Sequence, residues 1–448
     1  METLKFGKQS FSFQRAAHFH INGGILLMVI VMLAMVVANS PWSQEYTAFW
    51  NKEVYLQIGD FNLFNHHGSP MNLMTFINDV LMTIFFFSVG LEIKREILVG
   101  ELSSFRQALL PIIAACGGMI VPVIIYCFMT AGTEAENGLA IPMATDIAFS
   151  LGVLSLFGKR VPISLKIFLT AFAVVDDIGG ILIIALFYTS HLDVNWLLYA
   201  SVAFMALCAG NRMRVHNHWY YITVGFVLWY CFLQSGIHAT IAGVVAAFTV
   251  PATPHLHTGK YINYIKQNIE GFPANNNKKD NLILSKEQIN ALKCIESASD
   301  KVISPLQSLE DDLHALVNYV VIPLFAFANV GIDLAGMTIG TLFTGVALPV
   351  MVGLVVGKFV GVFSFSWIAI KCRLVTLPQG SDWRSFASVC MLCGIGLTVS
   401  IFIADLSYAS LQGGAAVLGQ AKLGILCGSF ISALLGVLLL NKYLPKKA

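Results

Sequence analysis

Two adjacent aspartates, Asp176 and Asp177, lie in the middle of a long apolar stretch of the sequence. A third acid, Asp146, interrupts the apolar stretch before it. An ionised carboxylate near the centre of a bilayer costs about 3 kcal/mol on insertion scales, so such a residue faces a cavity or a partner. Three carboxylates at this depth indicate a site that binds a cation, a proton, or the two in alternation.

Lys358 also lies within an apolar stretch, and it is the only cation that we place inside the membrane; we assign Lys422 to the outer side. An unpaired buried ammonium is prohibitive, so Lys358 needs a carboxylate partner. Asp176 and Asp146 are both candidates, and the sequence does not choose between them. Adjacent residues on a helix point about 100° apart, so one of Asp176 and Asp177 can pair with the lysine while the other faces an ion.

The composition indicates a protein that crosses a membrane many times. The chain has 448 residues, of which 56% are hydrophobic and only 12% are charged, and its mean hydropathy is +0.73. Soluble domains carry roughly 25% charged residues. About 20 apolar residues cross the hydrocarbon core as a helix. We predict an all-α membrane protein with twelve transmembrane helices, at about residues 22–39, 73–93, 107–130, 140–157, 164–189, 194–210, 218–234, 236–251, 315–332, 341–370, 384–405 and 420–441.

The predicted spans divide the chain into three parts. Residues 1–251 hold spans one to eight, 252–313 form a cytoplasmic loop with an insert, and 314–448 hold the last four spans. Lys and Arg gather in alternate connections, which predicts that both termini are cytoplasmic. The basic residues are accounted for by this bias, so they do not indicate nucleic-acid binding. The nine cysteines lack metal-binding spacing, which favours a role in packing.

Two connections are longer than the rest. In the outer loop at about 40–72, alternating apolar residues flank a Gly-Asp pair, which predicts a hairpin within 53–64. A lone hairpin is marginal in water, so it would lie on another surface or pair with a second copy of the chain; an ordinary loop is the alternative. The cytoplasmic stretch 252–313 is polar and contains no catalytic constellation.

Two of the predicted spans are interrupted. Pro142 and the polar pair Thr145-Asp146 interrupt the fourth, and the glycines of the stretch 393–400 interrupt the eleventh. Interrupted spans in corresponding halves are typical of the midplane site of a transporter. A broken helix frees backbone groups and presents two dipole ends near the break. A plain proline kink with glycine packing is the alternative, and Asp146 within the break argues against it.

A second group of charges lies at the cytoplasmic end of the second span. Glu92 and Glu96 are four residues apart and repel each other, and Arg95 tempers both. Crowded carboxylates can respond to pH at the mouth of a funnel. The alternative is an ordinary charged helix end. His238 is a further candidate for pH sensing, although a hydrogen-bonded structural histidine is the more common reading.

These motifs resemble those of the NhaA-type sodium/proton antiporters in their order and spacing. The matching segments are 91–96, 144–149, 174–179, 235–240, 323–329 and 393–396, and they cover nearly the whole chain. The resemblance implies a twelve-helix fold with inverted-topology repeats, for which this family is already known, and with two discontinuous helices, spans four and eleven, that cross.

The resemblance also implies roles for the polar residues. Asp177 would be the main sodium ligand, and Asp176 would bind a proton or pair with Lys358. We expect competition at this pair of carboxylates: Asp176 and Asp177 hold protons or a sodium ion, never both. Thr145, Asp146 and Lys358 would balance the charges at the crossing.

Regulation and assembly are implied in the same way. Glu92, Arg95, Glu96 and Glu310 fall where the family places pH regulation, and the 53–64 hairpin falls where it places dimer contacts. The stretch 253–303 is an insert longer than in the familiar members, so its role is the weakest part of the resemblance.

The expected function is electrogenic, pH-regulated exchange of sodium or lithium for protons in a bacterial inner membrane. This is secondary active transport, not an enzymatic reaction, and it needs no cofactor. The expected partners are sodium or lithium ions, protons, membrane lipid and a second copy of the chain, without nucleic acid. A sodium-coupled organic-anion symporter is the alternative. An intramembrane aspartyl protease is disfavoured, because it needs its acids on separate helices and usually a Gly-x-Gly-Asp element, which this sequence lacks.

Overall fold

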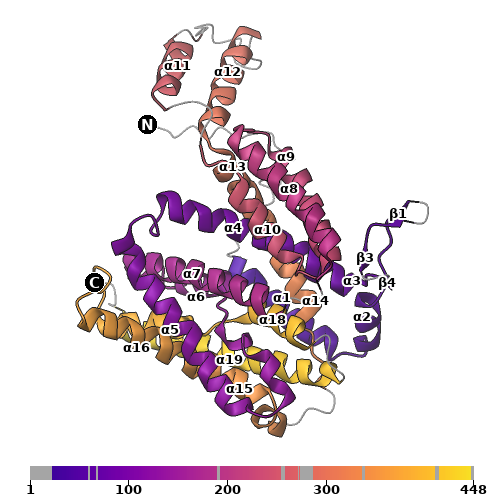
Figure 1. The fold of residues 1–448 in the computed structure, drawn as a ribbon. Coiled ribbons are helices and arrows are strands. Elements are labelled where there is room, and N and C mark those ends of the chain that lie inside the picture. Colours follow the sequence, from indigo (N-terminus) through magenta and orange to yellow (C-terminus); the bar gives the residue numbers. More distant parts are fainter. Residues whose placement is uncertain are drawn as a thin grey trace.

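The computed structural model describes residues 23–58, 61–66, 69–188, 192–253, 258–270, 272, 286–334, 339–408 and 413–444. Most of them are helical (Figure 1). The helices are α1 Gly23–Ala38, α2 Ser43–Trp50, α3 Leu73–Phe76, α4 Met82–Val99, α5 Phe105–Thr130, α6 Ile147–Ser155, α7 Ile163–Phe187, α8 Val194–Arg212, α9 His218–Ser235, α10 Thr240–Thr249, α11 Thr258–Glu270, α12 Lys286–Val302, α13 Pro305–Leu316, α14 Ile322–Val330, α15 Ala347–Val352, α16 Lys358–Lys371, α17 Trp383–Leu392, α18 Leu397–Tyr408 and α19 Gly414–Tyr443.

Short turns of other helical types join some of these helices. Single π-helical turns lie at Ile77–Leu81, Val317–Val321 and Gly353–Gly357, and 3₁₀ turns lie at Glu134–Gly138, Ile141–Met143, Gly158–Arg160 and Ile339–Phe343. Each π-helical turn connects two α-helical pieces of one span, as between α3 and α4. π-Helical turns are rare in proteins, and those that occur often lie at functional sites.

The described residues contain eight continuous helical segments that are long and apolar enough to cross a membrane. Two bent pairs bring the number to as many as ten: α1 with α2, bent by 112°, and α17 with α18, bent by 43°. The 18-residue α9 and the ten-residue α10 coincide with the seventh and eighth predicted spans. The prediction of an all-α, multi-pass membrane protein with discontinuous helices is confirmed.

The helices form two groups that pack against each other. In one group, α5 packs against α7 and α16, and α19 packs against α15, α17 and α18. In the other, α4 packs against α10 and α13, α8 against α9, and α1 against α14. Figure 1 shows the first group in its lower part and α8, α9, α10 and α13 in its upper part. Contacts of α1 with α6, and of α4 with α7, join the two groups.

Small residues allow the closest helix contact in the first group. Gly117 on α5 faces the backbone of Gly361 on α16, and neither position has room for a Cβ atom. Helices in a bilayer gain no hydrophobic free energy from each other, so close backbone approach and van der Waals contact drive their packing. This contact holds α16, which begins at Lys358, against α5.

The predicted hairpin within 53–64 is present. Strand β1 (Gln57–Ile58) pairs antiparallel with β2 (Phe61–Asn62), and residues 59–60 between them lie outside the described residues. A second short pair, β3 (Asn65–His66) with β4 (Ser69–Pro70), follows it. These strands lie at the edge of the molecule (Figure 1). The insert contributes α11 and α12, which project from the helical body in the same view.

Candidate ion-binding site

The breaks in spans four and eleven meet each other. In span four the chain is non-helical at 144–146, between the 3₁₀ turn that contains Pro142 and the start of α6; in span eleven it is non-helical between α17 and α18. The backbone N–H of Asp146 donates to the carbonyl oxygen of Ile395 at 2.6 Å. The Thr145 hydroxyl donates to the carbonyl oxygen of Cys393 at 2.9 Å. The predicted crossing of two discontinuous helices is therefore confirmed.

The Asp146 carboxylate lies at the start of two helices. As the N-cap of α6, it accepts a hydrogen bond from the backbone N–H of Phe149 at 3.0 Å. Its other oxygen accepts hydrogen bonds from Thr398, from the backbone N–H at 3.2 Å and from the hydroxyl at 2.7 Å. Thr398 is in the first turn of α18. The positive ends of both helix dipoles therefore stabilise this buried carboxylate.

Lys358 pairs with Asp176, which settles the choice that the sequence leaves open. Its ammonium contacts both carboxylate oxygens, at 2.8 and 2.6 Å, and both side chains are fully buried. The same ammonium lies 5.4 Å from the centre of the Phe172 ring. The pair is bidentate and sealed from water, so it compensates one of the three acids at the crossing.

Asp177 lies one residue further along α7 and faces a cavity of about 650 Å³. We call this cavity the funnel. We define its mouth by lining residues that are partly or fully exposed, which include Glu92, Arg95, Gly152, Glu310 and Asp311, and its floor by buried ones, which include Thr145, Asp146, Asp177 and Thr398. Among the described residues, no ion-pair partner faces the Asp177 carboxylate. The funnel therefore leads from a charged mouth to two carboxylates and two hydroxyl groups, which are ligands that suit a hard monovalent cation.

The charged mouth joins two spans. The Arg95 guanidinium lies 2.9 Å from a Glu96 carboxylate oxygen and 3.1 Å from a Glu310 carboxylate oxygen. Glu92 lines the funnel between this cluster and its floor. The structure thus brings four of the predicted pH-sensing residues together. The fifth, His238, lies just before α10 and does not line the funnel.

Sequence reasoning missed a further buried ion pair. Lys422, which we assigned to the outer side, lies within α19 and is 8% exposed. Its ammonium is 3.0 Å from a carboxylate oxygen of Asp405 on α18, a residue that we did not single out. Where we expected Lys422 in an outer connection, the structure buries it in a helix and pairs it with an acid. The signal was present, because both residues lie among apolar neighbours close to predicted spans.

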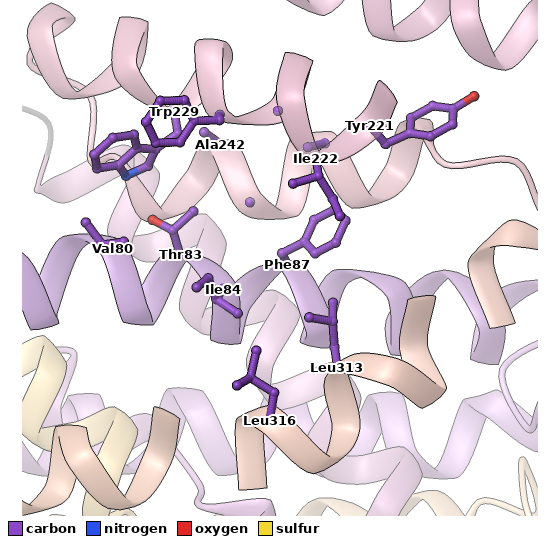
Figure 2. Close-up of a pocket in the computed structure, with 14 residues that line it drawn as sticks. Val80, Thr83, Ile84, Phe87, Tyr221, Ile222, Trp229, Ala242, Leu313 and Leu316 are labelled. Atoms are coloured by element: carbon purple, nitrogen blue, oxygen red, sulfur yellow. The ribbon is translucent and has the colours of Figure 1, made fainter. Parts of the chain in front are cut away.

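A second cavity, of about 270 Å³, lies apart from the acids (Figure 2). Its walls come from α4, α9, α10, α13 and the π-helical turn before α4, and they are almost entirely apolar. Figure 2 shows Phe87 and Leu313 pointing into it, whereas the Tyr221 hydroxyl points away from it. An apolar cavity offers no ligands to an ion. Of these two cavities, the funnel is the one whose lining offers oxygen ligands to a cation.

Comparison with known proteins agrees with this arrangement. The family described as Na+/H+ antiporter 1 matches residues 14–440 of the chain. A Na(+)/H(+) antiporter NhaA from Phocaeicola vulgatus is 64% identical over 448 residues, which covers all of this chain and 99% of the relative. The NhaA of Bacteroides thetaiotaomicron is 53% identical over 95% of this chain and 96% of its own length. That of Sulfurimonas denitrificans is 40% identical over 99% and 98%.

These matches extend over the whole crossing, including the segments that carry the three acids and Lys358. The chain therefore belongs to the NhaA family of Na+/H+ antiporters.

Proposed function

We propose that the protein is a secondary active transporter that exchanges sodium or lithium ions for protons across a bacterial inner membrane. The observation that carries this proposal is the funnel, which ends at Asp146 and Asp177, next to a third acid that Lys358 neutralises. Full-length relatives named Na(+)/H(+) antiporter support it. We infer that the funnel opens to the cytoplasm and that both termini are cytoplasmic, as the distribution of basic residues predicts.

Exchange follows from competition for the same carboxylate. Asp177 holds either a proton or a sodium ion, and Asp146 and the hydroxyls of Thr145 and Thr398 supply further oxygen ligands. A cytoplasmic sodium ion displaces the proton, the loaded site becomes accessible from the other side, and protons there displace the ion. A ligand shifts such an equilibrium only through its different affinity for the two states.

Asp176 and Lys358 make the exchange electrogenic in this proposal. When Asp176 takes up a proton, it releases Lys358, so a second proton can enter for each sodium ion that leaves. More positive charge then moves inward than outward, and the membrane potential drives sodium export. The bidentate pair supports this role because a proton on Asp176 competes directly with Lys358 for the carboxylate, so the pair separates only when the proton arrives.

The cluster of Glu92, Arg95, Glu96 and Glu310 is our proposed pH sensor. It links α4 to α13 at the funnel mouth, so a change in its protonation alters both the local field and the contact between the two helices. We also propose a homodimer through the 53–64 hairpin, with lipid around the spans. His238 stays a prediction, because its place outside the funnel gives it no direct influence on the ion.

The symporter alternative is not supported. The relatives carry antiporter names, and an acidic funnel floor repels an organic anion. An anionic substrate requires cationic groups that face the cavity, whereas the guanidinium of Arg95, which lines the funnel, lies at its mouth in ion pairs.

Asp177→Asn tests the proposed function. We expect the substitution to abolish sodium-driven loss of the proton gradient in everted membrane vesicles from pH 6.5 to 9, because an amide cannot exchange a proton for sodium. Asp312→Asn, a matched change at an exposed position of α13 outside the funnel, should leave exchange intact. Exchange retained by the Asp177 variant would refute the site. Clamping the membrane potential in the same vesicles tests electrogenicity, since an electroneutral exchanger would not respond.

A further inference from the structure

Helix α18 carries three layers of side chains on one face. Thr398, at the funnel floor, and Asp405 are seven residues apart, which places them on the same side of the helix about 10 Å apart along its axis. Phe402 lies between them, one turn from each. The face thus leads from the ion site, through an aromatic ring, to a second carboxylate.

The aromatic layer closes the path beyond the funnel floor. The Phe402 ring lies 5.7 Å from that of Phe86 on α4 and 6.3 Å from that of Phe325 on α14. All three rings are at most 3% exposed. Phe402 belongs to the first helix group and the other two belong to the second, so the layer spans the boundary between the groups. A hydrated ion cannot pass while these rings are in contact.

A polar layer follows the aromatic one, and it also spans the boundary. One oxygen of Asp405 contacts the Lys422 ammonium at 3.0 Å, and the other accepts a hydrogen bond from the Asn78 amide at 3.5 Å. Asn329 donates to the side-chain oxygen of Asn78 at 2.8 Å. Asn78 lies in the π-helical turn before α4, and Asn329 lies on α14. Four segments therefore converge on this layer.

The polar layer has an unused oxygen. Asn329 is 1% exposed, and within the described part of the chain its Oδ1 atom has no hydrogen-bond partner. A buried carbonyl-type oxygen without a donor is costly, and it has a ready use as a ligand for a cation. Together with the Asp405 carboxylate and the Asn78 oxygen, it forms a set of hard oxygen ligands of the kind that suits sodium.

We propose that Asp405, Asn78 and Asn329 form a second cation station, on the side of the ion pathway away from the funnel. The Lys422 ammonium occupies this station while the funnel is open. The inference rests on the proposed exchange of sodium for protons and adds a residue set to its pathway.

The lysine explains how the station would work. An ammonium carries the same single positive charge as sodium, so either one balances the negative charge of the Asp405 carboxylate. When the aromatic rings separate, a sodium ion released from Asp177 replaces the ammonium at Asp405. Lys422 is 8% exposed, which lets its ammonium move to water. The ion then leaves, and the lysine returns and closes the path behind it.

The test compares the two faces of the membrane. In the double variant Asp405→Asn/Lys422→Gln both charges are removed, so no buried charge is left unpaired. We expect the half-saturating sodium concentration to rise at least fivefold in right-side-out vesicles with an acidic interior, where sodium enters from the face opposite the funnel. In everted vesicles, where sodium enters from the funnel face, the half-saturating sodium concentration should change less than twofold. Glu45→Gln, which removes an exposed carboxylate from the first turn of α2, is the matched control.

A charge swap separates a station from a structural ion pair. Asp405→Lys/Lys422→Asp keeps a pair but moves the carboxylate away from the two asparagines. The station predicts that the swapped protein folds and still has the weaker sodium affinity at the far face. Recovery of native affinity by the swap, equal changes at both faces, or no change at either would overturn the station. Absence of exchange in the unsubstituted protein would instead refute the proposed function.

Discussion

The two buried lysine–aspartate pairs of the described residues differ in how fully the lysine occupies the carboxylate. Lys358 contacts both oxygens of Asp176, and neither side chain is exposed. Lys422 contacts one oxygen of Asp405, and the two side chains are 11% and 12% exposed. While Asp176 carries no proton, the first lysine cannot leave without stranding a charge in a dry interior, whereas the second can exchange its partner for water. The same residue types thus give a pair that only a proton can break in one place and a replaceable contact in the other.

Removing each lysine should expose this difference most strongly. We expect Lys358→Met to lower the free energy of unfolding by about 3–5 kcal/mol, because it strands the buried carboxylate of Asp176. Lys422→Met should cost roughly half of that loss or less, because the Asp405 carboxylate keeps its hydrogen bond from Asn78 and some contact with water. Thermal and denaturant unfolding of the purified protein in one detergent measures both. Equal losses would mean that the two pairs do not differ in the way described above.

A second substitution at the sealed pair sharpens the comparison. Adding Asp176→Asn to Lys358→Met should recover more than half of the lost stability, because replacing a whole buried pair by neutral groups is often close to neutral. The same unfolding measurement applies, with Asp312→Asn added to Lys358→Met as the matched control. If the double variant is no more stable than the single one, the lysine contributes through packing, not through its charge.

The smallest expected effect comes from an exposed carboxylate at the start of α17. Asp382 caps this helix, and Ser385 donates to it from its hydroxyl and, at 2.9 Å, from its backbone N–H. These hydrogen bonds hold the pKa of Asp382 below its usual value. Asp382→Ala should cost about 1 kcal/mol at neutral pH.

The pH dependence of that cost has a definite sign. A carboxyl group whose pKa is lowered by folding stabilises the protein above its unfolded pKa and loses this contribution as the pH falls through the folded value. The difference between Asp382→Ala and the unsubstituted protein should therefore shrink on acidification. A difference that is constant with pH would show that the cap acts without its charge.

The sequence predicted most of the fold and the funnel floor, because buried charge in a membrane is so costly that its position is informative. Asp146, Asp176, Asp177 and Lys358 stand out against apolar neighbours, and the breaks are marked by proline and glycine. The choice of Asp176 as the partner of Lys358 depended on side-chain geometry, which spacing along one helix cannot supply.

The far polar layer was harder to find for a physical reason. Asp405 and Lys422 lie near the ends of their predicted spans, where a charge is normally solvated and needs no partner. Asn78 and Asn329 are neutral, so they give no signal in a hydropathy profile. Only the fold shows that residues 78, 329, 405 and 422 converge.

The crossing itself has a mechanical consequence. Besides the bonds at Asp146 and Thr145, Ser150 donates to the carbonyl oxygen of Leu392 at 3.1 Å, and Ser400 donates to that of Ile141 at 2.8 Å. The two broken spans are thus tied to each other: the hydroxyl groups of Thr145, Ser150 and Ser400 each donate to the backbone of the other span, and Asp146 donates from its own backbone. Neither span can shift alone without breaking several of these bonds in a dry interior. We therefore expect the crossing to move as one rigid body, so that an ion bound there would travel together with its ligands.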